Sequence, residues 1–154
     1  MLRTQTPLSR ILYCTDFSDN ANAAFDQAVA IASAWPGCEL TLLHVLPEPD
    51  AQFWKTYIYE VGDVDEKAKA ALDQAIDRDY RPKVPADITL KTVFRIGKPA
   101  SQALELAQEI QAQLIVVGRS GAGSIGNLLF GSVAAKIVQK ATCPVLVIPM
   151  PDKA

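Results

Sequence analysis

The stretch from Val117 to Lys140 constrains the fold more than any other part of this chain. A continuous apolar run, Leu114 to Val117, precedes it and suits a strand that is buried on both faces. Five of the eight glycines then follow, at positions 118, 121, 123, 126 and 131. Beyond them, apolar residues recur at helical spacing at Ala134, Ile137, Val138 and Ala141. The pattern predicts a buried strand that ends at Gly118, a glycine-rich loop, and a helix that begins at Ser132.

Such a loop is a predicted anion site. Backbone N–H groups and the positive end of a helix dipole would converge there, and phosphate is the usual anion at such a point. Gly118, Gly121 and Gly123 are expected to allow positive φ and to leave no Cβ in the way of a phosphate. Gly131 would let the helix start approach the ligand, and Ser132 would serve as N-cap or contact a phosphate oxygen. The alternative is an ordinary flexible surface loop.

The rest of the chain alternates between strand and helix patterns. Because strands that alternate with helices form a parallel sheet with helices on both faces, the pattern predicts a single doubly wound α/β domain over residues 1–154. Residues 88–96 alternate between apolar and charged side chains, so that strand is expected at a sheet edge. The predicted strands are Arg10 to Thr15, Leu40 to Leu46, Ile88 to Ile96, Leu114 to Val117 and Pro144 to Ile148. Four helices are predicted. The first follows Ser18 as its N-cap, the second spans Asp63 to Tyr80, the third begins at Pro99 and the fourth begins at Ser132.

Composition excludes several classes of function. A net charge of −2 gives no electrostatic reason to expect nucleic acid binding. No apolar run approaches the roughly 20 residues that span a bilayer, and residues 1–10 lack the apolar core of a signal peptide, so we expect no membrane association. The three cysteines have neither metal nor redox spacing, and the single histidine, His44, excludes a histidine cluster. These features favour a cytoplasmic protein.

Ligands of open parallel sheets bind beyond the carboxyl ends of the strands, where the strand order reverses. Asp16, Val45 and Gly118 all lie at such ends, and Asp16 would face the glycine loop if the first and fourth strands are neighbours. Asp16 could instead cap the first helix. Arg119 could neutralise phosphates or be solvated. The aromatic residues Phe53 to Tyr59 could form a lid, or pack their long connection onto the core.

With these motifs the chain resembles the universal stress protein family, in its nucleotide-binding form. The family signature G-x2-G-x9-G-(S/T) is met by Gly118, Gly121, Gly131 and Ser132. The opening I-L-Y-C-T-D-F-S at 11–18, the L-L-H-V at 42–45, the G-K-P at 97–99 and the C-P-V-L-V at 143–147 also resemble family segments. The resemblance runs from Arg10 to Ile148.

The resemblance implies a fold of the adenine nucleotide alpha hydrolase type with strand order 3-2-1-4-5, a homodimer, and binding of ATP or AMP, with Mg²⁺ possible beside ATP. Thr15 and Asp16 would then belong to the nucleotide site, where Asp16 would bond the ribose or the adenine side, and Val45 would line the adenine pocket. Val117 and Gly118 would lie along the ribose. The phosphates would be held by backbone N–H groups of Gly121, Gly131, Ser132 and Val133, with Arg119 as a candidate counter-charge.

Three functions remain open from the sequence. The first is a nucleotide-binding regulatory protein of stress response that acts through an unknown protein partner. The second is a slow ATPase or nucleotide hydrolase, although the segment from Gly118 to Ser132 carries no carboxylate and no lysine for such chemistry. The third is a dimeric interaction module that binds no nucleotide. We expect a homodimer through Pro144 to Ile148, because the implied strand order puts this apolar strand at a sheet edge and it carries no charge. The alternative is a monomer whose edge is covered by the connection from Glu48 to Gly62.

Overall fold

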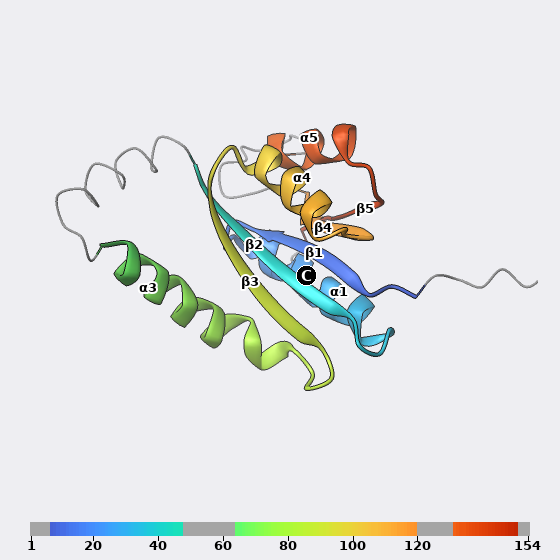
Figure 1. Ribbon diagram of the computed structural model, residues 1–154, viewed down its shortest axis with the longest axis horizontal. Coiled ribbons are helices and arrows are strands. Elements are labelled where there is room, and N and C mark those ends of the chain that lie inside the picture. The colour runs from blue at the N-terminus through green and yellow to red at the C-terminus, as the bar shows by residue number, and fades with distance from the viewer. Residues whose placement is uncertain (1–6, 48–63, 120–130, 151–154) are drawn as a thin grey trace, which may run out of the picture.

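The computed structural model describes residues 7–47, 64–119 and 131–150. Within these residues, five parallel strands form one sheet in the order β3-β2-β1-β4-β5, and four α-helices flank it (Figure 1). The strands are β1 (Arg10–Thr15), β2 (Glu39–Pro47), β3 (Thr89–Gly97), β4 (Leu114–Gly118) and β5 (Val145–Ile148). The helices are α1 (Asp19–Ser33), α3 (Val64–Asp79), α4 (Pro99–Glu109) and α5 (Ser132–Lys140), and a 3₁₀ turn, η1 (Arg81–Lys83), follows α3. The predicted fold class and strand order are therefore confirmed.

The helices form two layers, and each layer encloses its own apolar core. Helices α1 and α3 lie on one face of the sheet, whereas α4 and α5 lie on the other (Figure 1). Successive side chains of a strand point to opposite faces. Ile11 and Tyr13 of β1 therefore join the core under α1 and α3, while Leu12 joins the core under α4 and α5. All three are fully buried, as expected of a central strand covered on both sides.

The strand order reverses between β1 and β4. From β1 the chain builds outward through β2 to β3, crosses back to β4, and then builds the other way to β5. Strand β1 pairs with β2 on one side, where Thr15 lies opposite His44, and with β4 on the other, where Tyr13 lies opposite Val116. Since all strands run parallel, the carboxyl ends of β1, β2 and β4 share one edge of the sheet.

Local signals placed two helix starts correctly. The Ser18 side chain accepts a hydrogen bond from the Ala21 N–H and caps α1, as predicted. Pro99 is the first residue of α4, where its fixed φ fits the first turn. Strand β3 is an edge strand of the described sheet, as its alternating pattern predicted.

Helix α5 begins at Ser132, as predicted, but Ser132 is not its N-cap. The N-cap is Gly131, whose extended backbone (φ −65°, ψ 153°) has the geometry that a cap requires. Val138 shares the helical spacing of Ala134 and Ile137, but Val138 is 50% exposed, whereas Ala134 and Ile137 are buried. A nine-residue helix at the side of a small sheet buries a narrow stripe, and Val138 lies outside it.

No helix in the described ranges combines the length and the apolar character that crossing a membrane would require.

Candidate functional site

The predicted site residues gather at the carboxyl edge of the sheet, beside the point where strand order reverses. Thr15 ends β1 and is buried, and Asp16 follows it and is exposed. Val45, near the end of β2, is half-buried and packs against the core under α4 and α5. Val117 and Gly118 end β4, next to β1. Gly121 lies outside the described residues.

The loop that follows β1 is held by hydrogen bonds within itself. The Asp16 Oδ1 accepts from the Ser18 N–H at 3.0 Å, and the Thr15 Oγ1 accepts from the Phe17 N–H at 2.9 Å. Phe17 adopts φ +61°, a left-handed conformation that costs energy for a residue with a Cβ. Asp16 is therefore not the cap of α1, which is Ser18; its carboxylate instead braces the approach to that cap.

A second set of contacts joins this loop to Tyr80, Asn22 and His44. The Tyr80 hydroxyl lies 2.9 Å from the Thr15 Oγ1 and donates to the Asn22 Oδ1 at 2.5 Å. The His44 Nδ1 lies 3.0 Å from the Thr15 carbonyl oxygen, and the Phe17 ring lies 4.6 Å from the His44 ring. Burial raises the pKa of Tyr80, which keeps its phenol protonated and able to donate.

Sequence reasoning did not select Tyr80, Asn22 or Phe17. Tyr80 was predicted only as the last residue of a helix, yet it is 1% exposed and contacts residues 58 and 65 positions away in the chain. No spacing rule pairs residues so distant. A tyrosine next to the exposed charges of Asp79 and Arg81 was a weak signal, because it breaks a polar run.

Gly118 is needed for close approach rather than for positive φ, which corrects the prediction. Its φ lies outside the left-handed region, but a Cβ at this position would lie 3.1 Å from the Asn20 side chain. Asn20 is buried in the first turn of α1 and donates from its Nδ2 to the Ile148 carbonyl oxygen at 3.1 Å. The start of α1 thus packs directly against the end of β4 and reaches across to β5.

Backbone hydrogen bonds join the two ends of the glycine-rich stretch. The Arg119 N–H donates to the Ile148 carbonyl oxygen at 2.8 Å, and the Gly131 N–H donates to the Arg119 carbonyl oxygen at 2.6 Å. The start of α5 is therefore held against the end of β4. Because the first N–H groups of a helix have no intrahelical acceptor, those of Ser132 and Val133 are the best placed for an anion here. Both side chains are exposed, and that of Arg119 is half-buried.

In residues 7–47, 64–119 and 131–150, no group of three or more histidine, cysteine, aspartate or glutamate side chains is arranged to hold a metal ion. Cys14, Cys38 and Cys143 are free thiols. Desolvation raises the pKa of the Cys14 thiol to about 12, so it is protonated at neutral pH and a poor nucleophile.

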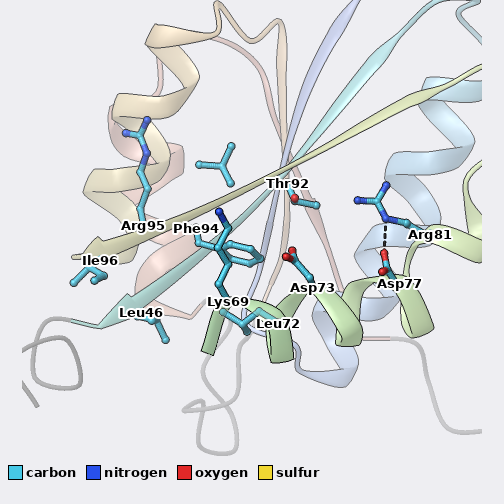
Figure 2. Close-up of a pocket in the computed structure, with 11 residues that line it drawn as sticks. Leu46, Lys69, Leu72, Asp73, Asp77, Arg81, Thr92, Phe94, Arg95 and Ile96 are labelled. Atoms are coloured by element: carbon cyan, nitrogen blue, oxygen red, sulfur yellow. Dashed lines mark hydrogen bonds and ion pairs between the residues drawn. The ribbon is translucent and has the colours of Figure 1, made fainter. Parts of the chain in front are cut away.

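A separate cleft lies between α3 and β3, and it contains none of the predicted site residues. Its volume is about 980 Å³, and Figure 2 shows Lys69, Leu72 and Asp73 on the side of α3 that faces β3. Five consecutive residues of β3, positions 92–96, line the cleft. Because consecutive strand residues point to opposite faces, the cleft runs along the edge of β3. Arg81 pairs with Asp77 at its rim, and Arg95 pairs with Glu109 of α4.

Comparison with known proteins agrees with this architecture. The sequence model described as "Universal stress protein family" matches residues 7–149. Universal stress protein YxiE of Bacillus subtilis (strain 168) is 28% identical over 146 residues, which span 91% of this chain and 98% of that protein.

Two solved structures are similar over almost the whole chain. The hypothetical protein MJ0577 has a TM-score of 0.77 and 25% identity, with 96% of this chain and 100% of that one covered. A universal stress protein in complex with cAMP has a TM-score of 0.63 and 27% identity, with 95% and 100% covered. These similarities extend well beyond the glycine-rich motif to the entire order of strands and helices.

Proposed function

This chain belongs to the universal stress protein family, and from that premise we propose that it binds an adenine nucleotide, ATP or AMP, between the end of β1 and the start of α5. The complex of a structural neighbour with cAMP supports an adenine nucleotide as ligand. We further propose that the bound nucleotide alters contacts with a partner protein in stress response, and that the site binds its ligand without rapid turnover.

One observation carries the proposal: the side chain of Asn20 lies against Gly118. This contact brings the start of α1, just after Asp16, to the end of β4, and backbone hydrogen bonds hold the start of α5 there as well. A carboxylate and a helix N-terminus consequently border the same edge of the sheet at the reversal of strand order. That is where open α/β sheets bind ligands.

The chemistry of the residues assigns each part of the ligand. Asp16 would accept hydrogen bonds from ribose hydroxyls, since a carboxylate close to phosphates would repel them. Val45 would line the adenine pocket with its half-buried side chain. The N–H groups of Ser132 and Val133 would hold phosphate oxygens at the positive end of α5, with Arg119 as counter-charge. With ATP, Mg²⁺ would bind mainly to the phosphates.

Titration calorimetry of the purified protein with ATP, ADP and AMP tests the proposal, with GMP as a control for base recognition. We expect saturable heat with at least one adenine nucleotide and a weaker response to GMP. Absence of heat with all three adenine nucleotides at high protein concentration would overturn the proposal. Release of γ-phosphate from labelled ATP separates binding from hydrolysis, and rapid multiple turnover would refute the proposed lack of catalysis.

We also propose a homodimer in which two β5 strands pair antiparallel across a two-fold axis. Strand β5 is an edge of the described sheet, and two such edges can close on each other. The Val147 side chain packs against the core under α4 and α5, so a charged substitution there would also disturb folding.

Val147→Pro is the better test of this dimer. The Arg119 N–H bonds the Ile148 carbonyl oxygen and the Ile115 N–H bonds the Pro144 carbonyl oxygen. By the alternation of a parallel ladder, the Val147 N–H points away from β4, where proline is tolerated. Sedimentation velocity should show a dimer for the wild type and a monomer for the variant. A monomeric wild type at micromolar concentration contradicts the dimer.

The proposed setting is the cytoplasm, where the three free thiols would remain reduced.

A further inference from the structure

We propose that Tyr80 is a positioning residue of the nucleotide site, which fixes Asp16 for ribose binding by holding both of its neighbours, Thr15 and Phe17. The identity of the ligand rests on the proposed function above. The contacts of Tyr80 do not depend on the ligand, because all of them are made with residues that the structure describes. Tyr80 is the first residue after α3, so the inference links a helix remote in sequence to the loop that carries the candidate ribose acceptor.

The hydrogen bonds around Tyr80 permit a single direction. The Asn22 Oδ1 can only accept, so the Tyr80 hydroxyl donates to it. The Tyr80 oxygen must therefore accept from the Thr15 hydroxyl, which lies 2.9 Å away. The Thr15 oxygen in turn accepts from the Phe17 N–H. The relay runs from the Phe17 amide through Thr15 and Tyr80 to Asn22, and each hydroxyl both accepts and donates.

The relay supports a strained residue. Phe17 has φ +61°, and strain of this kind persists only where surrounding contacts impose it. Its N–H is held by Thr15, and its ring lies 4.6 Å from the His44 ring and 6.0 Å from the Tyr80 ring. The Tyr80 ring is itself fixed in the core, 4.7 Å from the Phe25 ring in an edge-to-face arrangement. Tyr80 thus acts on Phe17 twice, through its ring and through its hydroxyl.

Asp16 lies between the two residues that Tyr80 holds. Its carboxylate accepts from the Ser18 N–H, so its direction depends on the path of the backbone from Thr15 to Ser18. A site that holds its acceptor in place before the ligand arrives avoids the entropic cost of ordering it on binding. Loss of the Tyr80 hydroxyl should therefore reduce affinity for the ribose more than it disturbs the fold.

The test is Tyr80→Phe, which keeps the ring and removes the hydroxyl. Ile76→Val is the matched control, because Ile76 is buried in the last turn of α3, just before Tyr80, and takes no part in the relay. Calorimetry would compare AMP with 2′,3′-dideoxy-AMP, which lacks the ribose hydroxyls that Asp16 would bind. We expect Tyr80→Phe to bind AMP about tenfold more weakly with little change for the dideoxy analogue, and Ile76→Val to affect both equally or neither.

A double-mutant cycle with Asp16→Asn separates positioning from general destabilisation. If Tyr80 acts through Asp16, Tyr80→Phe should cost little further AMP affinity once the carboxylate is gone. Additive losses, an equal loss for AMP and the dideoxy analogue, or no loss at all would overturn the inference.

Amide hydrogen exchange tests the same inference without a nucleotide, so a failure of the proposed function remains distinguishable. Tyr80→Phe should accelerate exchange of the Phe17 amide about tenfold relative to Ile76→Val, because the acceptor of that amide is no longer held. An unchanged rate would refute positioning by Tyr80, whatever the ligand.

Discussion

The two sides of the candidate site are built by different means. On one side, the β1 loop (residues 15–18) is fixed by side chains: Thr15, Tyr80 and Asn22 form a relay, and the Phe17 ring packs against the rings of His44 and Tyr80. On the other side, the α5 start (residues 131–133) is fixed by its backbone. The Gly131 N–H bonds the Arg119 carbonyl oxygen, and no side chain caps the helix.

The difference follows from what each side would recognise. A sugar hydroxyl demands an acceptor in one place, and a side-chain acceptor needs support from other side chains to stay there. A phosphate has several equivalent oxygens and is bound by N–H groups that the helix itself orients. Specificity should therefore reside mainly in the β1 loop and phosphate affinity in the α5 start, and substitutions can separate the two.

Gly131→Val should have the largest effect. The Gly131 backbone (φ −65°, ψ 153°) is accessible to valine, so the fold should survive with a cost of about 1 kcal/mol for the poorer cap. The branched side chain would obstruct phosphate at the α5 start, and ATP binding should fall at least about 100-fold. Calorimetry would measure this loss, with adenosine as the phosphate-free ligand.

The control is Val133→Ala, which shortens a side chain that is 36% exposed and keeps every N–H of the α5 start. It should bind ATP as the wild type does. If Gly131→Val retains wild-type affinity for ATP, the α5 start is not the phosphate site, and the proposed division between ribose recognition and phosphate binding is wrong.

Asp16→Asn should have the next largest effect, and it should weaken binding of the ribose and leave binding of the phosphate intact. Replacing the carboxylate with an amide weakens a charge-assisted hydrogen bond to the ribose, so AMP affinity should fall about tenfold or more. Binding of 2′,3′-dideoxy-AMP should hardly change. Equal losses for the two ligands would show that Asp16 acts on the fold of the loop and not on the ribose.

Gly118→Ala should lower folding stability at the contact between α1 and β4, where the two sides of the site meet. The new methyl group would lie 3.1 Å from the Asn20 side chain, which is buried and bonded to Ile148. We expect a loss of about 1–3 kcal/mol in the free energy of unfolding, measured by urea denaturation. The double variant with Asn20→Ala should recover part of the loss. Full additivity would mean that the contact with Asn20 is not what requires glycine.

The smallest expected effect is a loss of folding stability at alkaline pH, which should arise from desolvated ionisable side chains on the β1 side of the site. The pKa of Cys14 is raised to about 12 by desolvation, whereas an unfolded thiol ionises near about 8.5. The stability that this group contributes is complete below pH about 8.5 and declines as pH rises toward 12, since the unfolded chain releases the proton first.

Tyr13 and Tyr80, whose pKa values burial also raises, should add to the decline at higher pH. Urea midpoints at pH 7.5 and 10 would measure it, and Cys14→Ala should show a smaller difference between the two pH values than the wild type. An identical difference in both proteins would exclude Cys14 as a source.

Elements that depend on neighbours in the chain could be predicted. Ser18 as a cap, Pro99 as a first helical residue and the apolar run of β4 all follow from local rules, and all are confirmed. Errors arose where local rules left two solutions. Gly131 and Ser132 are both acceptable caps by residue type, and the backbone bond from Gly131 to Arg119 fits Gly131 in that position.

The sequence by itself determined the alternation of strands and helices, the family and the residues at the strand ends, because periodicity, capping and motif spacing act over a few to a few tens of residues. Tertiary structure alone decided that a Cβ at Gly118 would crowd the Asn20 side chain, and that Tyr80 contacts Thr15, the residue before Asp16. Both facts depend on residues about 60 to 100 positions apart that meet only when the sheet forms. No local sequence pattern predicts such a long-range contact, since many different residues can fill the space between two packed elements.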